Sequence, residues 1–117
     1  MGIYHTDGGL TRRIYSDTGT LGTVASNYPT NRGISPNNST APITILNLSL
    51  TNTTYAAVTV TISLAGTEIL SQELPGNANL IAIAKDSGII LDNSSYVSMS
   101  ASASSSVNYY LLCKQIG

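Results

Sequence analysis

The sequence contains no tryptophan, no phenylalanine, one cysteine, one histidine and few charged residues among its 117 positions. A single cysteine cannot form an internal disulfide, which fits assembly in a reducing cytosol. Five basic residues against six acidic ones leave a net charge of −1. Binding to nucleic acid or to an anionic membrane surface requires clustered basic side chains, so we expect neither partner. Because so few side chains titrate, we also expect no enzymatic activity and no catalytic residues.

Two kinds of segment are missing as well. No run of 18 or more apolar residues is present, so we expect no transmembrane helix. Residues 1–7 lack a basic region followed by an apolar one, so we expect no signal peptide. No window of 11 or more residues has an apolar stripe of 3.6-residue period, which predicts essentially no helix.

Metal and cofactor sites are not expected either. His5 has only Asp7 close to it in sequence, whereas zinc requires three or four ligands. Asp86 and Asp92 flank a short predicted strand, and one interpretation is that their carboxylates bind calcium. Aspartate is also common in turns, and a turn explains these two positions better.

The composition changes near Pro42. Residues 1–41 hold 7 of the Ile, Leu, Val and Met residues, whereas residues 42–117 hold 24. The first segment also carries six of the ten glycines and all three arginines. Such a stretch buries too little apolar surface to offset the entropy of ordering it. We therefore expect an extended N-terminal arm over residues 1–41, with one or two short strands at most, and a β domain over residues 42–117. Long loops folded over the domain are the alternative.

The second segment has the pattern of strands. Residues 55–64 alternate Val58, Val60, Ile62 and Leu64 with hydroxyl residues, which is typical of a half-buried strand. Residues 97–104 repeat the alternation, and shorter strands are expected at 68–74, 78–84, 88–91 and 107–114. Short strands separated by turns predict an all-β fold, an antiparallel β-sandwich or jelly-roll-like barrel.

Two local features are predicted in detail. In residues 43–50 the apolar positions are 43 and 45, then 46, 48 and 50, so the phase slips by one residue. A β-bulge near Ile45 and Leu46 keeps both halves facing the core. Ala65-Gly66 lies between two strand patterns and predicts a tight hairpin.

Residues 107–113 are apolar on both faces of the expected strand. Such a strand is either covered on both sides within the chain, here by the arm, or lies against another subunit. Cys113 is in phase with Val107, Tyr109 and Leu111, so we expect a core thiol.

Aromatic and arginine side chains provide the candidate contacts with partners. With asparagine, the seven tyrosines fit a sugar-binding platform; as the only large aromatic residues, they also fit ordinary packing. Arg12-Arg13 is suited to clamping the carboxylates of a neighbouring protein, or is simply solvated. The interface candidates are Arg12, Arg13, Tyr15, Tyr28, Arg32, Tyr109 and Tyr110.

Residues 43–113 resemble the small β-sandwich virion proteins of tailed bacteriophages. The resemblance is carried by residues 45–54, 58–71 and 97–103. It implies a structural part of the particle, with no catalytic residues and no cofactor. We expect a capsid decoration (cement) protein, commonly a trimer, whose arm crosses neighbouring major capsid subunits. The virion, assembled in the host cytoplasm, is the expected location. A tail or tail-fibre component, including a receptor- or glycan-binding module, is the alternative.

Overall fold

The computed structural model of the chain describes residues 3–7, 10–30, 42–84, 87–92 and 95–116. These residues form strands and contain no α-helix, as the sequence predicted. The strands are β1 (Ile3–Asp7), β2 (Leu10–Thr20), β3 (Ser26–Tyr28), β4 (Ile43–Asn52), β5 (Val58–Leu64), β6 (Thr67–Leu74), β7 (Asn79–Ile83), β8 (Ile90–Leu91), β9 (Val97–Ala101) and β10 (Val107–Ile116).

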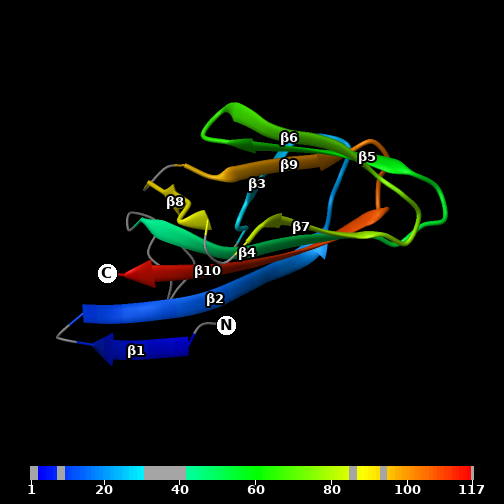
Figure 1. Cartoon of the computed structure of the whole chain (residues 1–117). Helices are drawn as coiled ribbons and strands as arrows, with labels where there is room; N and C mark the ends of the chain where they lie inside the picture. Colours follow the sequence, from blue (N-terminus) through cyan, green and yellow to red (C-terminus); the bar gives the residue numbers. More distant parts are fainter. Residues whose placement is uncertain (1–2, 8–9, 31–41, 85–86, 93–94, 117) are drawn as a thin grey trace.

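The strands are arranged in two antiparallel sheets that pack face to face (Figure 1). The large sheet has the order β1-β2-β10-β4-β7, with β8 paired to β4 beyond the bulged part of that strand. The small sheet has the order β3-β9-β5-β6. The predicted all-β antiparallel β-sandwich is therefore confirmed.

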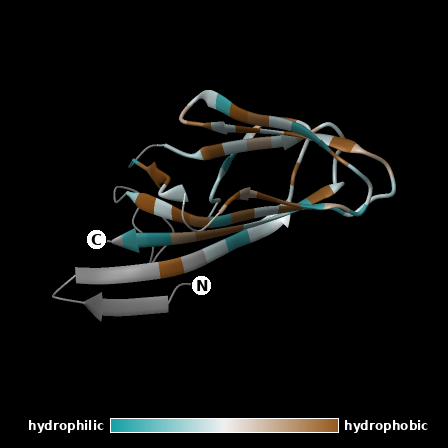
Figure 2. Cartoon of the chain, viewed as in Figure 1, coloured by the Kyte–Doolittle hydropathy of each residue, from teal (hydrophilic) through white to brown (hydrophobic). Residues whose placement is uncertain are grey.

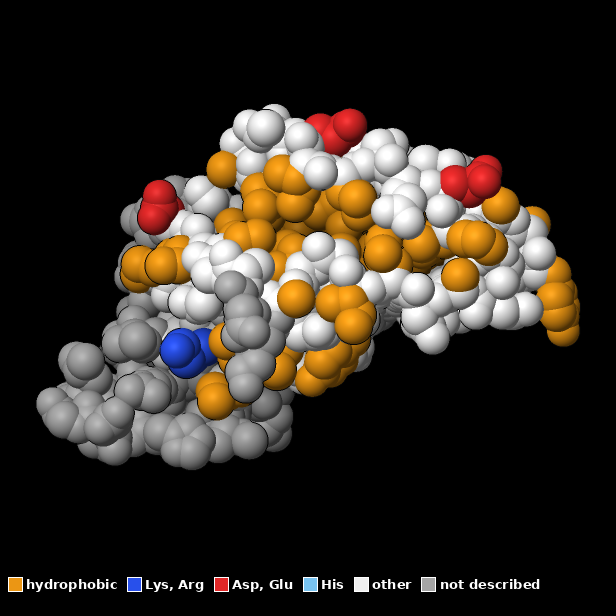
Figure 3. Space-filling model, viewed as in Figure 1, with side chains coloured by type: hydrophobic (Ala, Val, Ile, Leu, Met, Phe, Trp, Pro, Cys, Tyr) orange, Lys and Arg blue, Asp and Glu red, His pale blue; other side chains and the backbone are white. Residues whose placement is uncertain are grey.

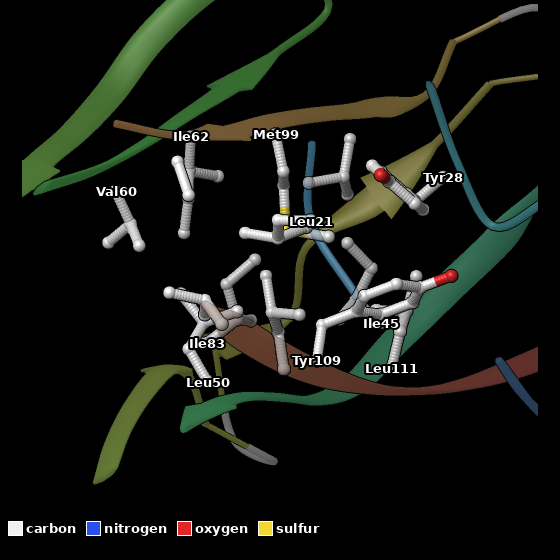
Figure 4. Close-up of a cluster of buried hydrophobic side chains, with 14 of the residues drawn as sticks. Leu21, Tyr28, Ile45, Leu50, Val60, Ile62, Ile83, Met99, Tyr109 and Leu111 are labelled. Carbon is white, nitrogen blue, oxygen red and sulfur yellow. The ribbon is translucent and has the colours of Figure 1, made fainter. Parts of the chain in front are cut away.

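Alternation along each strand explains why two sheets form and why they pack. Apolar and polar residues alternate in β5 and β9 (Figure 2), and the apolar members point inward. The inner side chains of the two sheets meet in one core (Figure 4). Its largest fully buried members include Leu21, Ile43, Ile45, Leu48, Leu50, Ile62, Met99 and Leu111.

The predicted bulge in β4 is present at Leu46. Cys113 of β10 lies opposite Ile45 and the preceding Leu112 lies opposite Asn47, so Leu46 has no partner in this register. The extra residue restores the inward phase, and both Ile45 and Leu48 are fully buried. Cys113 is buried in the same core, as its phase predicted.

The predicted hairpin joins β5 to β6. Leu64 pairs with Thr67, which leaves Ala65 and Gly66 as a two-residue turn. Both have positive φ, 49° and 85°, the backbone that a type I′ turn requires. Glycine adopts this conformation without strain, and it occupies the more positive of the two positions.

The N-terminal segment differs from the expected arm. β2 lies between β1 and β10 and pairs with β10 from Arg12 to Thr20. β3 extends the small sheet beside β9. Residues 10–30 are therefore part of the sandwich, and the boundary expected at residue 41 does not separate an arm from a domain there. Residues 31–41 lie outside the described residues.

Residues 21 and 22 carry the chain from one sheet to the other. The amide of Leu21 donates to the carbonyl of Val107 in the large sheet, at 2.8 Å. The carbonyl of Gly22 accepts from the amide of Ala101 in the small sheet, at 2.9 Å. The side chain of Leu21 is fully buried between them. This crossing fixes the segment to both layers of the sandwich.

Candidate functional site

The structure separates the predicted interface residues. The backbones of Arg12 and Arg13 belong to β2 and pair with both β1 and β10, and Tyr15 lies opposite Cys113. Arg32 lies outside the described residues.

Tyr28 and Tyr109 are core residues, which corrects the interface role expected of them. Both are buried, on β3 and β10 respectively. Their rings meet edge to face with centroids 4.6 Å apart (Figure 4). This contact between the sheets is a favourable aromatic geometry, and it leaves neither ring available to a partner.

A buried carboxylate organises this region. Asp17 of β2 is 8% exposed and accepts hydrogen bonds from the amide and hydroxyl of Thr30, at 2.8 and 3.0 Å. It also accepts one from the hydroxyl of Tyr109, at 3.2 Å. Gly19 lies opposite Tyr109, and a Cβ there would come within 3.0–3.3 Å of that ring. Asp17 and Gly19 therefore position the tyrosine ring and hold the chain at residue 30.

The surroundings of Tyr109 predict a stability loss at alkaline pH. Burial raises the pKa of Tyr109 well above 10, and the Asp17 carboxylate raises it further. Burial also raises the pKa of Tyr28. The neutral phenol is therefore favoured in the folded state, and this stabilisation is complete below the ordinary pKa and lost as pH rises beyond it.

We expect Tyr109→Phe to flatten the fall in unfolding free energy above pH 10, by up to about 1.4 kcal/mol per pH unit. At neutral pH the variant should lose about 1 kcal/mol with its hydrogen bond. Urea denaturation between pH 7 and 11 measures both effects, with the exposed Tyr55→Phe as control. Parallel pH profiles for wild type and Tyr109→Phe would contradict this account.

Tyr110 is the one predicted contact residue whose side chain the structure places on a surface. It is 41% exposed on β10, and the next outward residue, Leu112, is partly buried. Within the described residues β2 and β4 lie beside β10, and no strand lies over its outer face. In the described part of the N-terminal segment, β2 therefore lies beside β10 and does not cover its outer face. Contact of this face with another subunit stays a prediction.

The outer face of the large sheet is poor in charge. The strand register places Thr18, Tyr110 and Ser49 in one row across β2, β10 and β4, with Ile81 of β7 beyond them. Ile81 is 65% exposed. The register assigns further described residues to this face: Ile14, Ser16, Thr20, Asn108, Leu112, Lys114, Thr44, Asn47, Thr51, Asn79 and Ile90. Lys114 is the single charged residue among them.

A shallow depression lies at one end of this face. It measures about 260 Å³ and is lined by Pro42, Thr44, Ile90 and Lys114. Ile90 is 62% exposed there. Neither Ile81 nor Ile90 was among the predicted contact residues. Residues 80–83 are apolar at successive positions, the same two-faced signal that marked residues 107–113.

Apolar side chains also show along one side of the sandwich. Figure 3 shows hydrophobic atoms gathered between the two sheets, on the side where β6 and β7 form the sheet edges. The partly buried residues packed against the core are Leu64, Leu70, Leu80, Ala82 and Ile89.

The described residues contain neither a candidate metal site nor a helix that could span a membrane. Among those residues, no three His, Cys, Asp or Glu side chains are grouped so that they could hold a metal ion. The same residues include no helix of the length and hydropathy needed to cross a membrane. Asp86 lies outside the described residues, and Asp92 is exposed directly after β8.

Comparison with known proteins gave no match: no family model fits the chain, and no curated protein or solved structure is significantly similar to it.

Proposed function

We propose that the chain is a structural virion protein of a tailed bacteriophage, a capsid decoration protein that binds the major capsid protein. The resemblance of residues 43–113 to phage β-sandwich proteins supports the virion assignment. The observation that carries the mode of binding is the outer face of the large sheet, with exposed Tyr110, Ile81 and Ile90 and one charged residue in its described part.

The dimensions of this face suit a protein contact. Four adjacent strands about 4.8 Å apart, averaging about nine residues at about 3.4 Å, cover roughly 600 Å². One partner in a standard interface contributes about 800 Å². The face therefore supplies a large part of one interface, and a trimer on the shell multiplies weak contacts through effective concentration. Attachment by a separate arm is not part of this proposal, because residues 10–30 belong to the sandwich.

Substitutions on this face test the proposal. We expect Tyr110→Glu and Ile81→Glu to reduce particle binding at least tenfold while leaving the fold intact, because each would bury an added carboxylate in the contact without a partner from this face. Tyr55→Glu is the matched control, since Tyr55 is 95% exposed in the loop between β4 and β5. Co-sedimentation with particles that lack the protein measures occupancy.

Two results would contradict the proposal. Unchanged occupancy for both face variants would exclude this sheet face as the contact. Absence of the wild-type chain from capsids, with presence on tails or fibres, would favour the alternative of a tail component.

A further inference from the structure

The outer face of the small sheet is covered with hydroxyl groups. The outward residues of β5 and β9 are all serine or threonine: Thr59, Thr61, Ser63, Ser98 and Ser100. On β6 the register places Ser71 on the same face, between the two acidic residues Glu68 and Glu73. One row across the sheet runs from Asn27 of β3 through Ser98 and Ser63 to Glu68 of β6. Such a face offers donors and acceptors at regular spacing, because hydroxyl groups do both.

A depression opens at one end of this face. It measures about 430 Å³ and is lined by Asn27, Ser95, Tyr96, Ser98 and the Ala65-Gly66 turn. Ligand pockets commonly occupy about 300–1,000 Å³, so the space is sufficient for one or two sugar rings. The turn adds little side-chain bulk, and the strands on either side are fixed in the sandwich. The depression is therefore present in the folded chain without rearrangement.

The lining residues identify the chemistry of a ligand. An aromatic ring, an amide side chain and two hydroxyls line the depression, and none of its described lining residues is charged. A pyranose presents an apolar C–H face that stacks on an aromatic ring, and hydroxyls that pair with amides and other hydroxyls. A phosphate, sulfate or uronate would find no opposite charge among the lining residues.

We propose that this depression is a binding site for neutral carbohydrate, with Tyr96 as the stacking platform and Asn27 and Ser98 as hydrogen-bonding groups. A longer oligosaccharide continues from it onto the hydroxyl residues of β9 and β5. The site stands independently of capsid binding, since it lies on the opposite layer of the sandwich from Tyr110 and Ile81. A chain attached to the capsid by its large sheet would present its small sheet to the solvent outside the particle.

The test is a nuclear magnetic resonance titration of the full chain with a panel of neutral hexose and N-acetylhexosamine oligosaccharides. Acidic oligosaccharides form the comparison arm. We expect saturable shifts at Asn27, Ser98 and the 65–66 turn with at least one neutral member. Tyr96→Ala should weaken that binding at least tenfold. Tyr96→Phe, which keeps the ring, should remain within about threefold of wild type, and Tyr55→Ala, distant in the fold, should match wild type.

Each contrary outcome overturns the proposal. The first is the absence of a saturable shift with any neutral member up to about 10 mM, a concentration at which even weak binding is detected. The second is a preference for the acidic members. The third is an equal loss of binding in Tyr96→Ala and Tyr55→Ala. Circular dichroism of Tyr96→Ala checks that the fold is kept, and Asn27→Ala provides a second variant if it is not. Particle occupancy of Tyr96→Ala separates this site from capsid attachment.

Discussion

Replacing Asn52 with alanine is expected to lower the unfolding free energy by roughly 3–5 kcal/mol, since each buried group left unpaired costs about 1–3 kcal/mol. Asn52 is fully buried at the end of β4. Its Nδ2 donates to the carbonyls of Ala56 and Leu74 at 2.8 and 3.0 Å. Its Oδ1 accepts from the amide and hydroxyl of Thr54 at 2.9 and 2.8 Å. One side chain thus fixes the β4–β5 loop against the end of β6.

Urea denaturation monitored by circular dichroism measures this loss. Asn79→Ala is the matched control, because Asn79 is exposed and its side chain accepts one hydrogen bond, from Thr51 at 2.7 Å. The control should stay within about 0.5 kcal/mol of wild type. Similar midpoints for the two alanine variants would show that the buried amide network contributes little.

The second large effect is expected from Asp17→Ala. We expect it to cost roughly 2–4 kcal/mol, because the buried hydroxyl of Tyr109 and two partly buried donors of Thr30 lose their common acceptor. Asp17→Asn retains an acceptor oxygen and should lose about half as much. The loss should be largest locally, at Thr30, which follows the end of β3.

Hydrogen exchange and urea denaturation together test this prediction. The amide of Thr30 should exchange faster in Asp17→Ala even under conditions where β5 and β9 keep their protection. Glu73→Ala, which removes an exposed carboxylate from β6, is the control. If Asp17→Ala and Glu73→Ala behaved alike, the carboxylate would not be the anchor of this segment.

The sequence predicted the sandwich where apolar residues alternate strongly. β4, β5, β9 and β10 follow from their patterns, and the bulge at Leu46 follows from a one-residue phase slip. These strands form the centre of both sheets. At such positions burial of one face decides the local structure, so the pattern is sufficient.

The long strand β2 was not predicted, because two of its inward positions are not apolar. On β2 the inner face includes Asp17 and Gly19, and Tyr109 of the neighbouring strand supplies the bulk that β2 lacks. The carboxylate is satisfied by Thr30, thirteen residues further along the chain. Bulk and hydrogen bonds that are supplied by residues distant in the chain cannot be recognised from the residues of β2 alone.

The alternation along β10 separates its buried residues from its exposed ones, which the residue types alone do not. Tyr109 shares its phase with Val107, Leu111 and Cys113, all of which are buried, whereas Tyr110 has the opposite phase. Treating both tyrosines as contacts ignored that difference. Tyr96 could not be singled out in this way, because it precedes β9 and meets Asn27 only through the pairing of β3 with β9.

The bulges at the sheet margins govern how copies of the chain can associate. β6 has an irregular register at residues 68–70 and β7 at residues 81–83, and β3 is three residues long. An interrupted or very short margin is a poor template for an incoming strand. Along these three margins, growth into fibres by backbone pairing is therefore disfavoured. A densely packed array of this protein would rely on side chains for cohesion there, which keeps each copy separately foldable and the array reversible.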